Sequence, residues 1–387
     1  MEKLDVTNLD SNQKLVLQQI FNNELISRIQ ISKNLGINKA TISSILNKLK
    51  EKKLVNEVGQ GKSTKSGGRK PIILEINKNF GYVISLDIAY HSIEIIYSYF
   101  NGELLKYESI PLANQKITHV LELLKYHIDA DENFGTHFGL LGIAISVHGI
   151  VNNEQEIIHL PFHELEKVSM IESIKEIADV PVIVENEANF SAIYECNVNN
   201  SLEINNLITL SIHKGIGAGL IIDQKLYRGA NGEAGEIGKT LVSSIEDNER
   251  TYHKIEDLCS QDALVNKINK RLNTQNTLSE LKKMYYERNE IVQEEIQQFS
   301  IRIAILMYNL NMQLNPKVIY INCPLINEIP DLLDNIKTTF NQYTQKEIEI
   351  SLTSNVKFAT LFGATLAITQ KILDIENIKL NFSFREG

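Results

Sequence analysis

The sequence predicts a two-lobed α/β fold preceded by an N-terminal winged helix-turn-helix. Residues 12–52 carry three short helical patterns, with a glycine between the second and the third, and two strand patterns follow within 54–76. Beyond them strands alternate with helices, and a run of three strands occurs twice. Repeated strand–helix units indicate a duplicated α/β fold with a cleft between its halves. We therefore expect a head, residues 1–76, and a body, residues 77–387.

Composition and cysteine content restrict the class of protein. The 387 residues are 43% hydrophobic and 22% charged, which is typical of a globular protein with a large core. The sequence has no eighteen-residue apolar run and begins with polar residues, so we expect neither a membrane span nor a signal peptide. Three scattered cysteines favour a reducing compartment over a disulfide framework. These features predict a cytoplasmic protein with no membrane partner.

Charge is distributed unevenly along the chain. Residues 1–70 contain 13 basic and 6 acidic residues, a net charge of +7, whereas the whole chain has a net charge of −9. The remainder therefore carries −16. A basic head on an acidic body is expected where only the head meets a polyanion. Chance clustering of surface lysines is the alternative.

Local signals define the three helices of the head. Residues 12–23 give helical spacing to Leu15, Leu17, Ile20 and Phe21. Ser27 is suited to cap a second helix, and Gly36 supplies the turn that follows it. Asn38 is suited to cap a third helix, roughly Lys39–Lys52. The side chains expected to face inward from the second and third helices are Ile29, Ile31, Leu35, Ile42, Ile45, Leu46 and Leu49.

A short helix, a glycine turn and a second helix form an arrangement that reads DNA. Small hydroxyl groups near the start of the third helix are suited to reach base edges, and its lysines to neutralise phosphates. The residues that we predict to contact DNA from this helix are Asn38, Lys39, Thr41, Ser43, Ser44 and Lys48. A three-helix bundle that binds another protein is the alternative.

The segment between the two strands of the head, residues 60–71, contains glycine and basic residues but no acid. Such a segment cannot form a core. It is suited to lie along phosphates, or to place Arg69 in a narrow minor groove. We therefore predict a wing with a DNA-contacting arm, and a solvated linker is the alternative. The predicted contacts are Lys62, Lys65, Arg69 and Lys70.

The body shows the strand–helix pattern twice, and its nearly continuous apolar runs are typical of buried parallel strands. The first half is expected to contain strands at 82–89, 92–100, 103–110, 139–149 and 181–185 and a helix at 119–130. The second half is expected to contain strands at 206–213, 217–223, 225–229 and 317–322 and helices at 258–271, 277–287 and 289–314. A last helix is expected at 358–373.

Several motifs resemble the ROK family, which contains bacterial sugar repressors and sugar kinases. They are SRIQISKNLGINKATIS at 27–43, GGRKP at 67–71, VENEAN at 184–189, GIGAGLIIDQKLYRGANGEAGEIGK at 215–239, NPKVIY at 315–320 and LFGATLA at 361–367. Their order and spacing cover essentially the whole chain, and the resemblance is closest to the xylose-repressor branch. It implies an actin-like, ATPase-type fold, with lobe one at about 77–188 plus the C-terminal end and lobe two at about 189–370.

The nucleotide-binding elements of the family's kinases are altered in this chain. Asp87 is followed by Ile-Ala where the first phosphate turn has Asp-x-Gly, and Lys214 replaces a threonine before Gly-x-Gly. Asn322 and Cys323 replace a glycine pair, and Glu187 occupies the position of the catalytic Asp. Without these glycines the backbone cannot approach a phosphate closely. We therefore expect no ATP cofactor and no catalytic residue, with Asp87 as a structural remnant.

The zinc-binding element of the family is also absent. Lys239 stands where the long signature normally ends in His, and the cysteine cluster that follows in the family is missing. Cys259 is the one cysteine nearby, and a chance site made with His253 is the alternative. We expect no metal, with side-chain packing in its place.

The family's sugar-contacting positions are largely retained. A polyhydroxy ligand needs carboxylates and amides that form paired hydrogen bonds with it. The residues that match these positions are Asn186, Glu187, Glu236 and Glu256, and the same predicted set includes Gly149 and Lys239. Lys239 replaces a sugar-contacting His, and His148 replaces the proline before Gly149. The pocket is therefore suited to the family's sugar, to a different or phosphorylated sugar, or to none; capping or surface acids are the alternative role.

Together these features predict a sugar-responsive repressor of a carbohydrate operon, with xylose as the expected effector. The expected partners are double-stranded operator DNA, a small sugar and a second copy of the chain, with a tetramer as the alternative assembly. Sugar between the lobes would change the spacing of two heads on a pseudo-palindromic operator. Two other functions stay open: an active sugar kinase, and a ligand-independent DNA-binding regulator whose sugar pocket has decayed.

Overall fold

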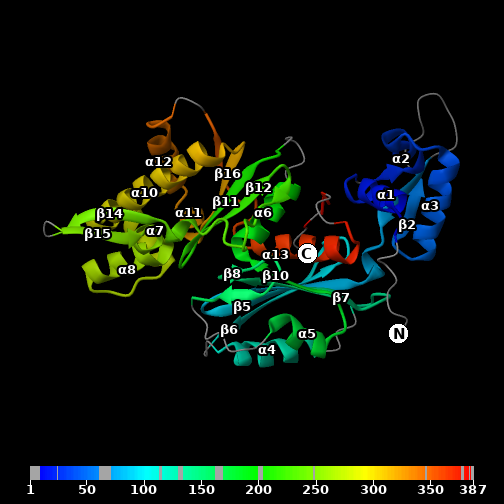
Figure 1. Ribbon diagram of the computed structural model, residues 1–387, viewed down its shortest axis with the longest axis horizontal. Coiled ribbons are helices and arrows are strands. Elements are labelled where there is room, and N and C mark those ends of the chain that lie inside the picture. Colours follow the sequence, from blue (N-terminus) through cyan, green and yellow to red (C-terminus); the bar gives the residue numbers. More distant parts are fainter. Residues whose placement is uncertain are drawn as a thin grey trace. The chain divides into compact units, whose positions relative to one another are not determined.

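The computed structural model describes most of the chain (Figure 1). The described residues are 9–23, 25–60, 71–112, 116–129, 134–161, 169–198, 204–246, 249–344, 347–375, 379–382 and 384. They belong to two units, of which unit 1 comprises residues 1–186 and 361–387 and unit 2 comprises residues 187–360. Among the described residues, none of the helices combines the length and the apolarity that a membrane crossing requires.

The head, part of unit 1, contains three helices and a three-stranded sheet (Figure 1). Its elements are α1 (Ser11–Phe21), β1 (Ile26–Ser27), α2 (Arg28–Leu35), α3 (Lys39–Glu51), β2 (Val55–Gln60) and β3 (Ile72–Ile76). The sheet has the order β1-β3-β2, and both pairs in it are antiparallel. Three helices followed by an antiparallel strand pair are the arrangement expected of a winged helix-turn-helix.

Capping side chains fix the ends of α2 and α3 where the sequence predicts them. Ser27 Oγ accepts a hydrogen bond from the Gln30 N–H, and Gln30 Oε1 accepts one from the Ser27 N–H. Gly36 ends α2 with a left-handed φ of 65°, which glycine adopts without steric cost. Asn38 begins α3 by accepting a hydrogen bond from the Thr41 N–H. Local chemistry therefore sets the turn between these helices.

The core of the head follows the predicted helical pattern with three exceptions: Leu35 of α2 is half-buried, and Ile29 and Leu15 are exposed. The predicted inward side chains of α3 are all buried: Ile42, Ile45, Leu46 and Leu49. Ile29 and Leu15, which the sequence also predicts to face inward, are 51% and 38% exposed. Ile29 lies in the first turn of an eight-residue helix, where only Ile31 is buried. In α1, Val16 occupies the core position instead of Leu15.

The C-terminal segment of the chain packs between the head and the rest of unit 1. The Phe382 ring lies against Phe21 of α1, with centroids 5.5 Å apart, and Phe21 lies 6.0 Å from Phe100. Lys14 of α1 also forms an ion pair with Asp374, with the Nζ and Oδ2 atoms 2.6 Å apart. Helix α1 is therefore held by contacts with two residues near the C-terminus, Asp374 and Phe382.

A five-stranded mixed sheet forms the centre of the rest of unit 1. The elements of this part of unit 1 are η2 (Lys78–Phe80), β4 (Tyr82–Ile88), β5 (Ser92–Tyr99), β6 (Leu104–Pro111), α4 (Ile117–Asp129), β7 (Leu140–Val147), β8 (Ile150–Val151), β9 (Ile157–His159), α5 (Met170–Ile177), β10 (Val182–Asn186) and α13 (Ala359–Ile372), whose first two residues belong to unit 2. The order in the sheet is β10-β7-β4-β5-β6. Side chains alternate along β4: Leu86 packs with α4 and α5, whereas Ser85 bonds Thr365 of α13 on the other face.

A second five-stranded sheet forms the centre of unit 2. The elements are α6 (Glu187–Val198), β11 (Leu207–Ile212), β12 (Ile216–Ile222), β13 (Lys225–Leu226), η3 (Ile237–Lys239), β14 (Leu241–Glu246), β15 (Glu249–Lys254), α7 (Ile255–Cys259), α8 (Gln261–Leu272), α9 (Leu278–Tyr286), α10 (Glu290–Leu314), β16 (Val318–Asn322), α11 (Pro324–Glu328), α12 (Asp331–Asn341) and β17 (Glu349–Leu352). The order is β13-β12-β11-β16-β17. Helix α6 packs on one face, and the larger core, with residues of α7 to α12, covers the other.

The two large sheets have the same topology, which confirms the predicted duplication. In each, three consecutive strands pair antiparallel, and two later strands add in parallel beside the first. The carboxyl ends of parallel strands are the edge at which open α/β sheets bind ligands. Each unit therefore has one such edge of its own.

Two predicted elements of unit 2 differ in the structure, and α6, α11, α12 and β17 form where no element is predicted. The single helix predicted at 258–271 is two helices, because Ser260 begins α8 by accepting a hydrogen bond from the Ala263 N–H. The strand predicted at 225–229 is reduced to the two residues of β13. The segment that replaces the family's cysteine cluster forms the antiparallel hairpin of β14 and β15.

Candidate DNA-binding surface and ligand-binding residues

Helix α3 presents the predicted DNA-contacting residues in two groups. Lys39, Ser44 and Lys48 are exposed. Asn38 and Thr41 are engaged at the start of the helix, because Asn38 Oδ1 accepts hydrogen bonds from both the N–H and the hydroxyl of Thr41. The exposed group is therefore the part of α3 best placed to meet a duplex. The predicted contacts of the arm lie outside the described residues: Lys62, Lys65, Arg69 and Lys70.

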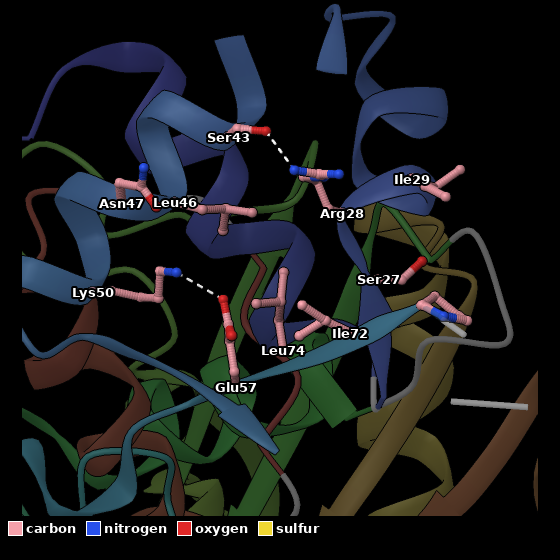
Figure 2. Close-up of a pocket in the computed structure, with 11 residues that line it drawn as sticks. Ser27, Arg28, Ile29, Ser43, Leu46, Asn47, Lys50, Glu57, Ile72 and Leu74 are labelled. Atoms are coloured by element: carbon pink, nitrogen blue, oxygen red, sulfur yellow. Dashed lines mark hydrogen bonds and ion pairs between the residues drawn. The ribbon is translucent and has the colours of Figure 1, made fainter. Parts of the chain in front are cut away.

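Ser43 links the two helices of the helix-turn-helix. Its hydroxyl donates a hydrogen bond to the Lys39 carbonyl at 2.7 Å and accepts one from the Arg28 guanidinium at 2.8 Å (Figure 2). Arg28 is the first residue of α2. Arg28 is not among the predicted contacts, although its positive charge and its place in the motif at 27–43, directly after the Ser27 cap, could have indicated it.

Asn186 and Gly149 lie together at the carboxyl edge of the sheet in unit 1. Asn186 is the last residue of β10, and its Nδ2 donates a hydrogen bond to the Gly149 carbonyl at 2.9 Å. A Cβ atom at Gly149 would collide with the carbonyl oxygen of His159, so only glycine fits this position. The structure therefore brings these two predicted residues into contact.

Asp87, at the end of β4, lies at the same edge. Ser146 Oγ donates a hydrogen bond to Asp87 Oδ1 at 2.6 Å, and His148 Nε2 is 3.4 Å from Asp87 Oδ2. The turn after β4 is closed by a hydrogen bond from the Ala89 N–H to the Ser92 carbonyl. These contacts are consistent with a structural role for Asp87.

Two predicted carboxylates of unit 2 lie beside glycines at the start of β12. Glu256 Oε2 is 3.4 Å from the Ile216 backbone N, and a Cβ atom at Gly215 would lie 3.0 Å from the same oxygen. Glu187, the first residue of α6, is 7% exposed. Its Oε1 would lie 3.6 Å from a Cβ atom at Gly217. The absence of a side chain at Gly215 therefore lets Glu256 approach the backbone closely, whereas a Cβ atom at Gly217 would make only an ordinary contact with Glu187.

Glu236 and Lys239 form an ion pair on the loop beside β12. Lys239 Nζ is 2.8 Å from Glu236 Oε2, and the two side chains are 36% and 27% exposed. The loop is held by a hydrogen bond from the Ala218 N–H to the Gly235 carbonyl at 2.8 Å. Gly235 has a φ of 95°, and a Cβ atom there would collide with the Ala218 carbonyl oxygen. Correct placement of Glu236 therefore depends on a glycine.

The set in unit 2 is chemically suited to a polyhydroxy ligand. Three carboxylates accept hydrogen bonds from hydroxyl groups, and one ammonium group donates them. Within the part of the chain that the structure describes, no group of three or more His, Cys, Asp or Glu side chains is arranged to hold a metal ion. Cys259 is buried and donates a hydrogen bond to the Ile255 carbonyl, and burial raises the pKa of its thiol to about 12. His253 Nε2 is 3.3 Å from Thr251 Oγ1.

The fold is a duplicated α/β body preceded by a small head of three helices and a three-stranded sheet, and comparison with known proteins identifies the family. The chain belongs to the ROK family, whose model matches residues 83–370. It is 58% identical to the xylose repressor of Staphylococcus xylosus over 375 residues, which cover 96% of this chain and 98% of that repressor. It is 38% identical to the xylose repressor of Lactiplantibacillus pentosus, with 96% and 95% covered.

Solved structures show the same fold. A ROK family transcriptional regulator, described as a homologue of the E. coli MLC protein, matches with a TM-score of 0.78 at 22% identity, covering 95% of this chain and 97% of that one. A ROK family glucokinase from Streptomyces griseus, in complex with glucose and AMPPNP, matches with a TM-score of 0.64 at 18% identity, covering 74% and 98%. The ROK fold predicted from the motifs is thereby confirmed.

Proposed function

We propose that this protein is a sugar-responsive DNA-binding transcriptional repressor of a carbohydrate-utilisation operon, with xylose as its effector. One observation carries the proposal: the 58% identity to a xylose repressor extends over 96% of the chain and therefore includes most of the head as well as the body. The exposed lysines and serine of α3 support the same conclusion, because they suit phosphates and base edges.

Operator binding is assigned to two heads of a homodimer. A dimer with twofold symmetry suits a pseudo-palindromic site, in which successive major grooves face one side of the duplex. The net charge of +7 on residues 1–70 predicts a strong dependence of affinity on salt, because each neutralised phosphate releases counterions. A tetramer is the alternative assembly, and sedimentation of the protein with and without DNA distinguishes the two.

The sugar is assigned to the residues at the carboxyl edges, with Glu187, Glu236 and Glu256 as the acceptors of unit 2 and Asn186 beside Gly149 in unit 1. Sugar binding and operator binding are proposed to oppose each other. A coupling free energy of roughly 1–3 kcal/mol would weaken operator binding about 5–150-fold.

Fluorescence anisotropy with a duplex that the protein selects from a random pool tests this function. The expected result is tight binding that falls when xylose is added, with a smaller fall in Glu187→Gln. Selection of no duplex would overturn DNA binding. A thermal-shift panel of sugars separates this function from a decayed pocket, because a ligand at 100 times its Kd should stabilise the protein by about 2.7 kcal/mol. Absence of any shift would favour decay.

We also propose that the protein needs neither ATP nor zinc. For ATP, the contacts of Asp87 with Ser146 and His148 support the proposal, because they engage the carboxylate near the end of β4. ATP hydrolysis measured with xylose and glucose is expected at background level. Steady turnover that disappears in Glu187→Gln would instead establish the kinase alternative. Unchanged melting in the presence of EDTA is expected for a protein without structural zinc.

A further inference from the structure

The head contains an open groove beside the predicted DNA-reading face. It has a volume of about 360 Å³ and lies between α3, the start of α2 and strand β3 (Figure 2). On α3 it is lined by Ser43, Asn47 and Lys50, whose spacing of four and three residues places them on one face of the helix. Because Ser43 belongs both to this groove and to the predicted reading face, the two surfaces are continuous. We call this feature the wing groove.

The walls of the wing groove are partly apolar and exposed. Ile29 and Ile72 line it and are 51% and 41% exposed. Each leaves a large part of its apolar surface exposed, Ile29 from α2 and Ile72 from β3, so a partner that covers them would bury apolar area.

Two cations and one carboxylate lie at the rim of the wing groove. Lys50 Nζ is 2.7 Å from Glu57 Oε1, so this pair is neutralised internally. Arg28 donates its hydrogen bond to the neutral hydroxyl of Ser43, and among the described residues its guanidinium has no carboxylate partner. The groove therefore offers one positive charge that the described part of the head does not balance. Figure 2 shows Arg28 directed toward Ser43 and Lys50 toward Glu57.

We propose that the wing groove binds the sugar–phosphate backbone of the operator, beside the major groove contacted by α3. This inference rests on the proposed function. Deoxyribose rings would pack against Ile29 and Ile72, and Arg28 would donate hydrogen bonds to a phosphate. The same phosphate would benefit from the first turn of α2, whose N–H groups favour an anion. Glu57 would limit affinity, because it faces the same anionic backbone and holds Lys50.

Two substitutions with opposite effects on the salt dependence test this proposal. Arg28→Gln keeps a hydrogen-bond donor for Ser43 but removes one phosphate-neutralising charge. It should weaken binding about tenfold on operator and random DNA alike. It should also lower the slope of log K against log salt by about 0.9. Glu57→Gln releases Lys50 and should strengthen binding and steepen the slope by a similar amount. A purely structural role for either residue would change the melting temperature without changing the slope.

Lys33→Gln is the matched control, because Lys33 is an exposed cation in the last turn of α2, at the opposite end from Arg28. Its affinity and slope should equal those of the wild type. If Arg28→Gln keeps the wild-type slope, or loses affinity for the operator alone, the backbone assignment is overturned while the proposed function stands. If the wild-type protein binds no duplex, the proposed function itself fails.

Discussion

Asn22 and Asn381 are joined by a hydrogen bond in which the Asn381 backbone N–H donates to the Asn22 side-chain oxygen at 2.8 Å. The Asn22 side-chain nitrogen donates in turn to the Lys379 carbonyl at 3.0 Å. The oxygen and the nitrogen of the Asn22 side-chain amide therefore both hold the C-terminal segment against the end of α1.

Replacing Asn22 should loosen this attachment. Asn22→Ala removes two hydrogen bonds and is expected to lower the free energy of unfolding by about 1–2 kcal/mol. It should also speed amide hydrogen exchange in α1, which mass spectrometry can measure. Asn23→Ala is the control, because Asn23 is exposed and its amide donates to the Gln19 carbonyl of α1 rather than to the C-terminal segment. Equal exchange in the two variants would show that the Asn22 contacts do not hold the head.

The loop that carries Glu236 should be sensitive to substitution of Gly235. Gly235→Ala combines a positive φ of 95° with a collision against the Ala218 carbonyl oxygen, and we expect a loss of about 3 kcal/mol together with weaker xylose binding. Gly139 also has a positive φ, 64°, but open space where a Cβ atom would stand. Gly139→Ala should therefore cost about 1 kcal/mol and leave xylose binding unchanged. Thermal unfolding and xylose titration measure both effects, and equal losses would rule out the collision.

The pH dependence of stability should include a contribution from Glu295. Burial alone would raise the pKa of this carboxyl, but Lys267 and Arg271 outweigh burial and lower it. Lys267 Nζ is 2.7 Å and Arg271 Nη1 is 2.6 Å from its oxygens. A lowered pKa in the folded state stabilises the protein above the unfolded value, about 4.3, and this stabilisation is lost as the pH falls through the folded pKa.

Urea unfolding from pH 7 to pH 3 measures this contribution. Glu295→Gln should be less stable than the wild type at pH 7, and the difference should shrink as the pH falls. Glu294→Gln is the control, because Glu294 contacts Arg271 but its side chain is 61% exposed. A difference that stays constant over this pH range would contradict the assignment.

The cysteines should be unreactive in the folded protein. Cys196, Cys259 and Cys323 are all buried, and burial raises the pKa of both Cys259 and Cys323 to about 12. At pH 8 only about one in ten thousand of those thiols is ionised. A thiol-reactive chromogenic disulfide should therefore modify no cysteine rapidly in the native protein and three after denaturation. Rapid modification of Cys259 in the native state would disprove its burial.

The sequence predicts features that depend on neighbours along the chain. The caps at Ser27 and Asn38 and the glycine turn at Gly36 follow from local backbone chemistry, and all three occur in the structure. The exposure of Ile29 could not be predicted, because a helix of two turns gives too short a pattern to define its buried side. The contact between Phe21 of the head and Phe382 could not be predicted either, because it joins residues at opposite ends of the sequence.

The candidate ligand residues likewise divide into features that the sequence predicts and contacts that only the structure shows. The motifs predict Glu236 and Glu256, but only the structure shows that Lys239 neutralises Glu236 and that Glu256 approaches Gly215. Glu57 lies in no quoted motif and Arg28 has no assigned role within its motif, and the roles proposed for them depend on β2 and the start of α2 lying beside α3. A charge pattern along the chain does not reveal which charges face one groove.

The dependence of the head on the C-terminal segment has a consequence for synthesis. Asn22 leaves the ribosome 357 residues before Lys379, its hydrogen-bonding partner. At roughly 5–20 residues per second, about 20–70 seconds separate the two events. During that interval the nascent head has no Phe382 to cover Phe21, so a growing chain presents its basic helices without the support that fixes their orientation in the finished molecule.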